Sequence, residues 1–303
     1  MTFPLRHAIL GAGGVGGLMA ACLTRIGASV TLVLRPESLA QYPERLQLES
    51  PFGNFSVAVE RSSEVPPCDV LWITVKATQL ETALRAITKP ESVRAIVPLL
   101  NGIDHISLLR SKYGKDKITP ATIAVESERV APGHIIHRSP FARLSVLSTG
   151  RALLEGTLQQ LQHIGFECRF VDQEPTLMWT KLVFLAPFAL TTTAADKTTG
   201  EILSDPRWSQ PGLACLRETA SVAVAEGAKI DVEKVIAGAS KMPGNMRSSM
   251  QKDVEQGKAP ELDAIAGPIL RGAKRHGIDV PATEELVSAV QRRLESRKKH
   301  PAA

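Results

Sequence analysis

Three glycines near the N-terminus have a spacing at which a polypeptide backbone can bind phosphate. Gly11, Gly13 and Gly16 follow the apolar run 8–10 and precede a stretch rich in small residues, which predicts a strand, a tight turn and a helix. Glycines at these places permit the turn, a close approach to a pyrophosphate and tight packing of helix on strand. The N–H groups that begin the helix favour an anion. We therefore predict a dinucleotide-binding "glycine turn" formed by Gly11, Ala12, Gly13, Gly14, Val15 and Gly16.

Arg35 indicates which dinucleotide binds. It follows the second predicted strand, 30–34, where many such domains place an acidic residue. A carboxylate would bind the ribose 2′-hydroxyl of NAD and repel a 2′-phosphate, whereas a guanidinium binds phosphate through paired hydrogen bonds. Arg35 therefore favours NADPH as the cofactor. The alternative is that Arg35 is a solvated residue at a strand end.

Polar residues also follow the next two predicted parallel strands. Lys76 comes directly after the apolar run 69–75, and Asn101 follows the strand 94–99. Open parallel sheets bind ligands at the carboxyl ends of their strands, so both side chains are candidates for the cofactor site. Each also has a plainer interpretation, Lys76 as the start of a surface helix and Asn101 as part of an Asn-Gly turn.

Lys181 is the candidate proton donor of the C-terminal half. It lies in a predicted helix over 176–190, where Leu185 and Ala189 share its face. Pro187 is expected to bend this helix. A lysine ammonium beside a ketone can protonate the oxygen and stabilise the alkoxide while hydride adds to the carbon. A solvent-exposed lysine on an amphipathic helix would show the same spacing.

The order of the predicted elements divides the chain into two domains. Strands and helices alternate as far as the strand 167–171, with a β-hairpin inserted over 46–60, and long helical periods follow from about residue 174. The chain is long enough for two hydrophobic cores. We predict an α/β protein with an N-terminal Rossmann dinucleotide-binding domain, 1–172, followed by an all-helical C-terminal domain for substrate binding and dimerisation, 173–303.

Composition and charge narrow the class of protein. With 44% hydrophobic and 22% charged residues, the chain is typical of soluble globular proteins. No apolar stretch approaches the roughly 20 residues of a membrane span, and no secretory leader is recognisable, so no membrane partner and a cytoplasmic location are expected. The net charge of +5 suits anionic ligands such as NADPH and a carboxylate substrate.

Two further features of the sequence predict no special chemistry. The basic segment 292–300 could contact nucleic acid, but a solvated helix end with cations that suit the helix dipole is favoured, so no nucleic-acid partner is expected. The four cysteines are far apart and fit neither a metal motif nor a disulfide framework. We interpret them as reduced thiols of the core and expect no metal.

A set of short motifs runs through nearly the whole chain in a fixed order. They are the glycine turn, Arg35, D-V-L-W-I-T-V-K-A-T-Q, P-L-L-N-G, P-G-H-I-I-H, W-T-K-L, S-S-M-x-x-D and P-E-L-D. In this combination the chain resembles the ketopantoate reductase (2-dehydropantoate 2-reductase) family. That resemblance implies a Rossmann domain followed by a helical domain, and the NADPH-dependent reduction of ketopantoate to pantoate in pantothenate and coenzyme A biosynthesis.

The resemblance also implies roles for individual residues. Lys181 would be the general acid, Glu261 the carboxylate that orients the substrate hydroxyl and the lysine, and Ser249 a ligand of the substrate carboxylate. Lys76 and Asn101 would line the cofactor end of the site, where Asn101 also contacts substrate. A homodimer is expected on the same ground. From the residues alone, Ser249 belongs only to a loop or helix cap, and Glu261 is only an acid at a helix start.

Two positions depart from the family pattern. Members that make pantoate place asparagines one and two turns after the lysine, where this sequence has Leu185 and Ala189. Losing a buried hydrogen bond to the substrate costs about 1–3 kcal/mol, so the substrate-binding surface is expected to be more apolar. The leading hypothesis is NADPH-dependent reduction of a small 2-oxo acid, with ketopantoate as first candidate. The alternatives are a reductase of a different 2-oxo acid or ketone, and a non-catalytic NADP(H)-binding sensor.

Overall fold

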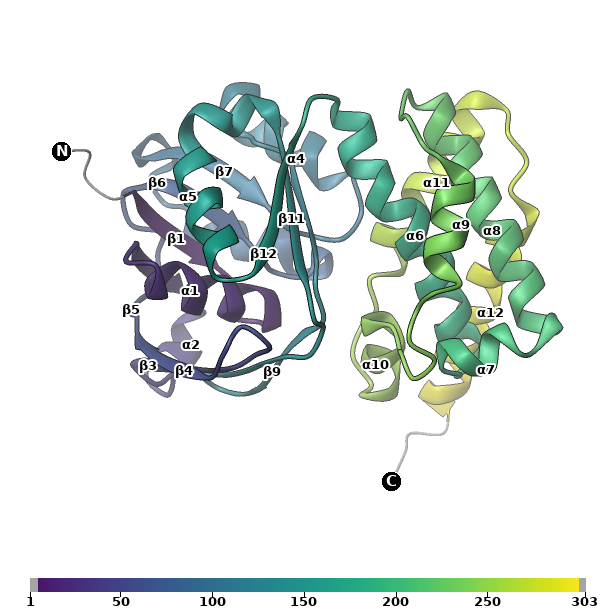
Figure 1. Ribbon diagram of the computed structural model, residues 1–303, viewed down its shortest axis with the longest axis horizontal. Helices are drawn as coiled ribbons and strands as arrows, with labels where there is room; N and C mark the ends of the chain where they lie inside the picture. The colour runs from purple at the N-terminus through teal and green to yellow at the C-terminus, as the bar shows by residue number, and fades with distance from the viewer. Residues whose placement is uncertain (1–4, 300–303) are drawn as a thin grey trace. The chain divides into compact units, whose positions relative to one another are not determined.

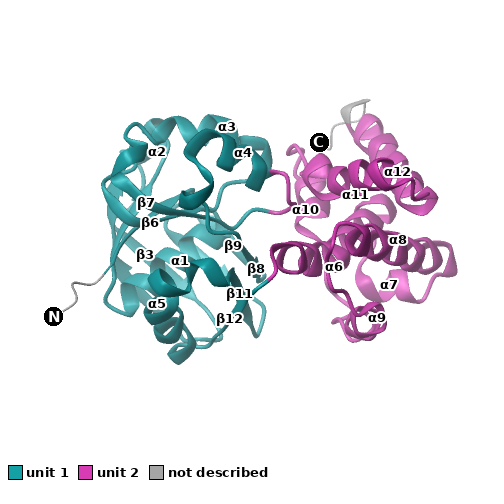
Figure 2. Cartoon of the chain, turned by 90° about the horizontal axis from the view of Figure 1, so that it is seen from above, with its two compact units in different colours: residues 1–100, 105–172 teal, residues 101–104, 173–303 magenta. Residues whose placement is uncertain are grey.

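The structure, a computed structural model, describes residues 5–299 and divides into two compact units (Figure 1, Figure 2). The α/β unit runs up to Leu100 and continues over His105–Asp172. The helical unit contains Asn101–Asp104 together with the chain from Gln173 onward. The predicted fold class, a parallel α/β sheet followed by a helical region, is confirmed. The short segment Asn101–Asp104 differs from the predicted division, because it groups with the helices although it lies between two elements of the α/β unit.

A five-stranded parallel sheet forms the centre of the α/β unit, in the order β5-β2-β1-β6-β7. Its two inner neighbours hold β1 in register, with Leu10 opposite both Val33 of β2 and Ile73 of β6. Strands β1, β2, β6 and β7 are short and largely apolar, as expected for a parallel sheet that is covered on both faces, whereas the edge strand β5 is polar. Their bounds are β1 Arg6–Leu10, β2 Ser29–Val33, β5 Glu60–Ser62, β6 Cys68–Ile73 and β7 Val93–Pro98.

Two smaller sheets complete the strands of this unit. One has the order β4-β3-β10-β9 and contains the predicted hairpin, and the other has the order β12-β11-β8. The strand-like run 118–127 of the sequence is divided between β8 and the start of β9, which belong to different sheets. The bounds are β3 Arg45–Glu49, β4 Phe55–Ala58, β8 Ala121–Ala124, β9 Ser127–Ala131, β10 His134–His137, β11 Ala142–Leu147 and β12 Phe166–Val171.

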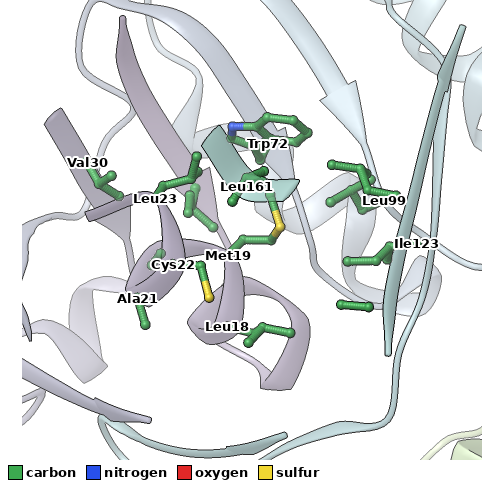
Figure 3. Close-up of a cluster of buried hydrophobic side chains, with 14 of the residues drawn as sticks. Leu18, Met19, Ala21, Cys22, Leu23, Val30, Trp72, Leu99, Ile123 and Leu161 are labelled. Atoms are coloured by element: carbon green, nitrogen blue, oxygen red, sulfur yellow. The ribbon is translucent and has the colours of Figure 1, made fainter. Parts of the chain in front are cut away.

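Helix α1, Gly14–Arg25, is the most buried helix around the central sheet, with no exposed side chain from Gly16 to Leu23. Its residues Leu18, Met19 and Leu23 pack among side chains such as Trp72 of β6, as Figure 3 shows. The other helices are α2 Pro36–Leu39, α3 Leu80–Ala83, α4 His105–Tyr113 and α5 Arg151–His163. Helix α3 is only one turn long and is flanked by two 3₁₀ turns, η1 Ala77–Gln79 and η2 Leu84–Ala86.

The helical unit is built around α6, Glu174–Ala195, which continues through Pro187. The prediction that no apolar stretch approaches the length of a membrane span is wrong for this helix, which is long and apolar enough to cross a membrane by length and composition. Its most apolar stretch is 67% buried within the protein, which is typical of the core helix of a domain. The helices that surround the core are α7 Thr199–Leu203, α8 Pro206–Ala225, α9 Val232–Ala239, α10 Ser249–Glu255, α11 Leu262–His276 and α12 Pro281–Lys299.

Two arginines in the basic C-terminal helix are anchored, which differs from the solvated helix end expected from sequence. Arg293 forms an ion pair with Asp196 at the end of α6, and it donates to the carbonyl oxygen of Thr193. Arg297 donates to the carbonyl oxygen of Val254 on α10. These cations therefore hold α12 against α6 and α10, since each finds an acceptor on a neighbouring helix.

Candidate active site

The structure explains why the glycine turn needs glycine at its first and last positions. Gly11 has φ +110°, and a Cβ there would lie 2.7 Å from Cγ1 of Val75. A Cβ on Gly16 would overlap the carbonyl oxygen of Gly11, so only glycine lets α1 pack this closely on the turn. The Thr74 hydroxyl donates to the Gly11 carbonyl at 2.8 Å and holds the turn against the end of β6.

Gly13 leaves the space that a dinucleotide would need. It is the N-cap of α1, and apart from its two chain neighbours no described residue has an atom within 4 Å of the position that its Cβ would occupy. A Cβ on the next residue, Gly14, would instead overlap the backbone of Ser127. The open side of the turn is therefore at Gly13, beside the first N–H groups of α1, which have no partner within the helix. This cradle fits a pyrophosphate.

Arg35 lies where the sequence analysis predicts it, after the end of β2. Its backbone is extended, and Pro36 begins the short helix α2 directly after it. The Nε atom is 3.5 Å from Oε1 of Glu37, and the Arg35 side chain is 74% exposed. The sequence analysis missed Glu37, although its place two residues after Arg35 would have been a sufficient signal. The Glu37 carboxylate competes with a 2′-phosphate for the Arg35 guanidinium. It can also accept a hydrogen bond from a ribose hydroxyl.

Lys76 also belongs to the α/β unit. It follows the end of β6 and is the extended N-cap of the 3₁₀ turn η1, where its carbonyl accepts from the N–H of Gln79. The side chain is half-buried. Its position at the carboxyl end of a central strand agrees with the predicted placement, and its role in cofactor binding stays a prediction.

In the helical unit, Asn101 joins the two residues predicted to be catalytic. The Lys181 ammonium donates to Oδ1 of Asn101 at 2.9 Å, and Nδ2 of Asn101 donates to Oε2 of Glu261 at 3.0 Å. The amide matches this arrangement, because its oxygen faces the cation and its NH₂ group faces the anion. We call Lys181, Asn101 and Glu261 the proton-transfer triad.

Burial sets the protonation behaviour of the triad. It lowers the pKa of Lys181 from 10.5 to about 8, and the opposing charge of Glu261 limits the decrease. A lysine with this pKa is still largely protonated at neutral pH and releases its proton more readily than an exposed lysine does. Both properties are those of a general acid that operates near neutral pH.

Glu261 is held at the beginning of a helix. It is the N-cap residue of α11 and is only 7% exposed. A carboxylate at this end of a helix is favoured by the helix dipole. The partners of the Glu261 carboxylate include the amide of Asn101, the charge of Lys181 and the N-terminus of its own helix.

The two serines before α10 have different environments. Ser248 is the N-cap residue, only 1% exposed, and its hydroxyl accepts from the N–H of Gln251 while it is bonded to the Thr192 hydroxyl at 2.8 Å. Ser249 is the first residue of α10 and is exposed. Ser248 is therefore structural, and Ser249 is the serine whose hydroxyl is accessible to a ligand. Its predicted binding of a substrate carboxylate stays a prediction.

The structure separates the two positions that depart from the family pattern. Leu185 is half-buried and packs at the edge of the helical core, one turn after Lys181. Ala189, one turn further, is fully buried inside that core. Only Leu185 is placed to contribute an apolar surface beside the triad, because the Ala189 side chain is enclosed by protein.

Comparisons with known proteins agree with the predicted family over most of the chain. The family model described as "Ketopantoate reductase PanE/ApbA" matches residues 7–146, and the model for the C-terminal part of the same family matches residues 176–294. A 2-dehydropantoate 2-reductase of Caulobacter vibrioides is 30% identical over 291 residues, which cover 93% of this chain and 96% of that protein.

Solved structures share the fold. A PanE/ApbA family ketopantoate reductase from Ralstonia eutropha JMP134 superimposes with a TM-score of 0.84 at 25% identity, covering 97% of this chain and 100% of the other. D-mandelate dehydrogenase, solved with NADH and anilino(oxo)acetate, superimposes with a TM-score of 0.85 at 22% identity, covering 97% and 100%. The second likeness concerns the fold alone. The family matches and the full-length relative show that this chain belongs to the ketopantoate reductase family of oxidoreductases.

Proposed function

We propose that this protein is an NADPH-dependent reductase of a small 2-oxo acid, with ketopantoate as the first candidate substrate. The observation that carries the proposal is the proton-transfer triad, in which a lysine of lowered pKa is bonded to Asn101 and faces Glu261. Relatives named 2-dehydropantoate 2-reductase support ketopantoate as the substrate.

The cofactor would be held by the α/β unit. The backbone of the glycine turn would bind the pyrophosphate at Gly13, Arg35 would pair with the 2′-phosphate, and Lys76 would contribute a further positive charge. When bound, NADPH supplies the hydride that reduces the ketone carbon. The open space at Gly13 and the guanidinium after β2 both fit this cofactor.

Lys181 would donate a proton from Nζ to the ketone oxygen of the substrate. Its ammonium charge also stabilises the negative charge that develops on that oxygen. Asn101 and Glu261 keep the ammonium oriented, since the amide oxygen of Asn101 accepts a hydrogen bond from the ammonium and the carboxylate of Glu261 accepts one from the amide NH₂ group. After the transfer the neutral amine regains a proton from water, which a pKa of about 8 allows at neutral pH.

A second candidate function is the reduction of a 2-oxo acid with an apolar chain. The observation that favours it is Leu185, which presents a half-buried hydrocarbon surface one turn after the proton donor. Such a surface offers no hydrogen bond to the substrate hydroxyl of ketopantoate, and it contacts a branched or aromatic side chain favourably. Ser249 would bind the carboxylate in either case.

The experiment is to measure NADPH oxidation by the purified protein with ketopantoate, pyruvate, 2-oxoisovalerate and phenylglyoxylate, and to repeat it with NADH. The first candidate predicts the highest kcat/KM for ketopantoate. The second predicts that 2-oxoisovalerate or phenylglyoxylate exceeds ketopantoate, and that Leu185→Asn reverses the order. NADPH binding without turnover on any of these ketones would instead favour a sensor. The homodimer and the cytoplasmic location stay predictions.

A further inference from the structure

We propose that Arg271 is a positioning residue for Lys181, because it fastens the segment Asn101–Asp104 to α11 and thereby keeps Asn101 between the lysine and Glu261. We call the contacts of Asp104, Arg271 and Asp263 the arginine clasp. The clasp exists whatever the protein reduces, and its effect on catalysis rests on the proposed function.

The clasp begins on α11 and ends on the segment that carries Asn101. Arg271 donates from Nη1 to Oδ1 of Asp263 at 2.9 Å, and its Nη2 is hydrogen-bonded to Oδ2 of Asp104. The guanidinium lies along the helix over Gly267, where a Cβ would overlap Nη2. The absence of a side chain at Gly267 thus lets the arginine reach both carboxylates.

The segment Asn101–Asp104 contacts α11 at three places, which follow one another along the helix. Asn101 bonds to Glu261 at the N-cap, Gly102 lies against the carbonyl of Ala264, and Asp104 meets Arg271. Gly102 has φ +82°, and a Cβ on it would overlap the Ala264 carbonyl oxygen. The backbone of the segment therefore follows the first turns of α11, and Arg271 holds its far end.

The exposure of the clasp favours a positioning role over a stabilising one. The side chains of Arg271 and Asp104 are 46% and 57% exposed, and ion pairs this exposed contribute little to the free energy of unfolding. The guanidinium remains charged throughout the working pH range. Without it the segment is freed at Asp104, and Asn101 loses the support that keeps its amide oxygen on the ammonium.

The expected consequence concerns the proton of Lys181. An ammonium that loses an acceptor is less stable relative to the amine, so the pKa of Lys181 falls when Asn101 moves away. The ionisable group that faces Lys181 is Glu261, which itself bonds to the same amide. Both neighbours of the lysine are thus disturbed by one substitution at a residue that does not touch it.

The experiment measures how readily the Lys181 amine reacts as a function of pH, and it requires no substrate. Full-length wild type and variants are labelled with acetic anhydride from pH 6 to 10, and acetylation of Lys181 is followed by peptide mass spectrometry. With Arg271→Gln we expect the midpoint of the labelling curve at lower pH and about threefold faster labelling at pH 7. With Arg271→Lys, which keeps a positive charge, the labelling curve should lie between those of the wild type and Arg271→Gln. The matched control is Arg275→Gln, one turn later on α11, where the arginine bonds instead to Glu226 and the curve should not move.

Two further variants keep the test decisive. Asp104→Asn removes the charged partner of Arg271 on the segment and should shift the labelling curve in the same direction. It supplies the test if Arg271→Gln folds poorly. In the background of Asn101→Ala, Arg271→Gln should add no further shift, because both act through the same amide. A wild-type labelling curve for folded Arg271→Gln and Asp104→Asn would overturn the proposal.

Activity separates this inference from the proposed function. With an active 2-oxo acid we expect Arg271→Gln to lower kcat about 10-fold, with a smaller change in KM and unchanged NADPH binding. If no 2-oxo acid is reduced by the wild type but the labelling curve shifts, the clasp is supported and the proposed function is not. If reduction is rapid and neither kcat nor labelling changes in Arg271→Gln, the clasp is wrong and the proposed function stands.

Discussion

The glycine turn and the proton-transfer triad represent two ways of building a site. The turn consists of six neighbouring residues, and its important atoms belong to the backbone. The triad consists of three side chains from a loop, a helix and a helix N-cap, with separations of 80 and 160 residues along the chain. A contiguous backbone site depends mainly on local conformation, whereas a dispersed side-chain site depends on the packing that brings its members together.

The sharpest way to break the triad is to remove its ammonium. Lys181→Ala should lower kcat by about 1000-fold, since general acid catalysis and charge stabilisation disappear together. NADPH binding, followed by the fluorescence of the bound nicotinamide, should stay within about twofold, because the glycine turn, Arg35 and Lys76 lie in the other unit. A Lys181→Ala protein that reduces its substrate at the wild-type rate would rule out this role.

The matching change in the glycine turn is Gly13→Val. The side chain would occupy the open space over the N-cap of α1, so NADPH binding should weaken by roughly 100-fold. The melting temperature should change little, because among residues 5–299 only the chain neighbours of Gly13 come within 4 Å of the new Cβ. Gly156→Ala on α5, another position with free space around it, is the control and should leave binding intact. Unweakened NADPH binding in Gly13→Val would place the pyrophosphate elsewhere.

The pH dependence tests the electrostatics of the triad. Because Lys181 has a pKa of about 8, kcat/KM for the ketone should fall above pH 8, by about tenfold per pH unit. The contribution of Lys181 to the free energy of unfolding should instead increase as the pH rises. Between pH 8 and 10.5 the unfolded state holds a proton that the folded lysine has released, so this residue adds stability as the pH rises. An activity profile that is flat to pH 10 would contradict the lowered pKa or the role of Lys181.

The smallest effects are expected at the cofactor's 2′ position. Arg35→Asp should weaken NADPH binding by roughly 30-fold more than NADH binding, because the phosphate loses its guanidinium and meets a like charge. Glu37→Gln should strengthen NADPH binding by up to about fivefold, since an exposed ion pair of 3.5 Å no longer competes for Arg35. Titration calorimetry with both cofactors measures each change. Equal losses of NADPH and NADH in Arg35→Asp would exclude Arg35 as the phosphate ligand.

The same contrast explains which parts of the fold could be predicted. Strands β1, β2, β6 and β7 lie within a few residues of their predicted positions, because each is a continuous apolar run. The sequence analysis does not predict the short helix α7, and it leaves α10 open, since it assigns Ser249 to a loop or a helix cap. Both depend on caps, the box formed by Thr198 with Glu201 and the buried hydroxyl of Ser248. The anchoring of Arg293 was missed for a similar reason, since its acceptors lie about 100 residues earlier in the chain.

The sequence by itself determined the fold class, the family and the conformation of the glycine turn. Each of these depends on residue types at short range, where the lack of a Cβ at Gly11 and Gly16 leaves few alternatives. Only the tertiary structure decided that Asn101 belongs with the helices, that it bridges Lys181 and Glu261, and that Arg271 fastens its segment. The physical reason is that a side-chain hydrogen bond and the pKa of a half-buried lysine depend on neighbours supplied by distant parts of the chain, which no local pattern encodes.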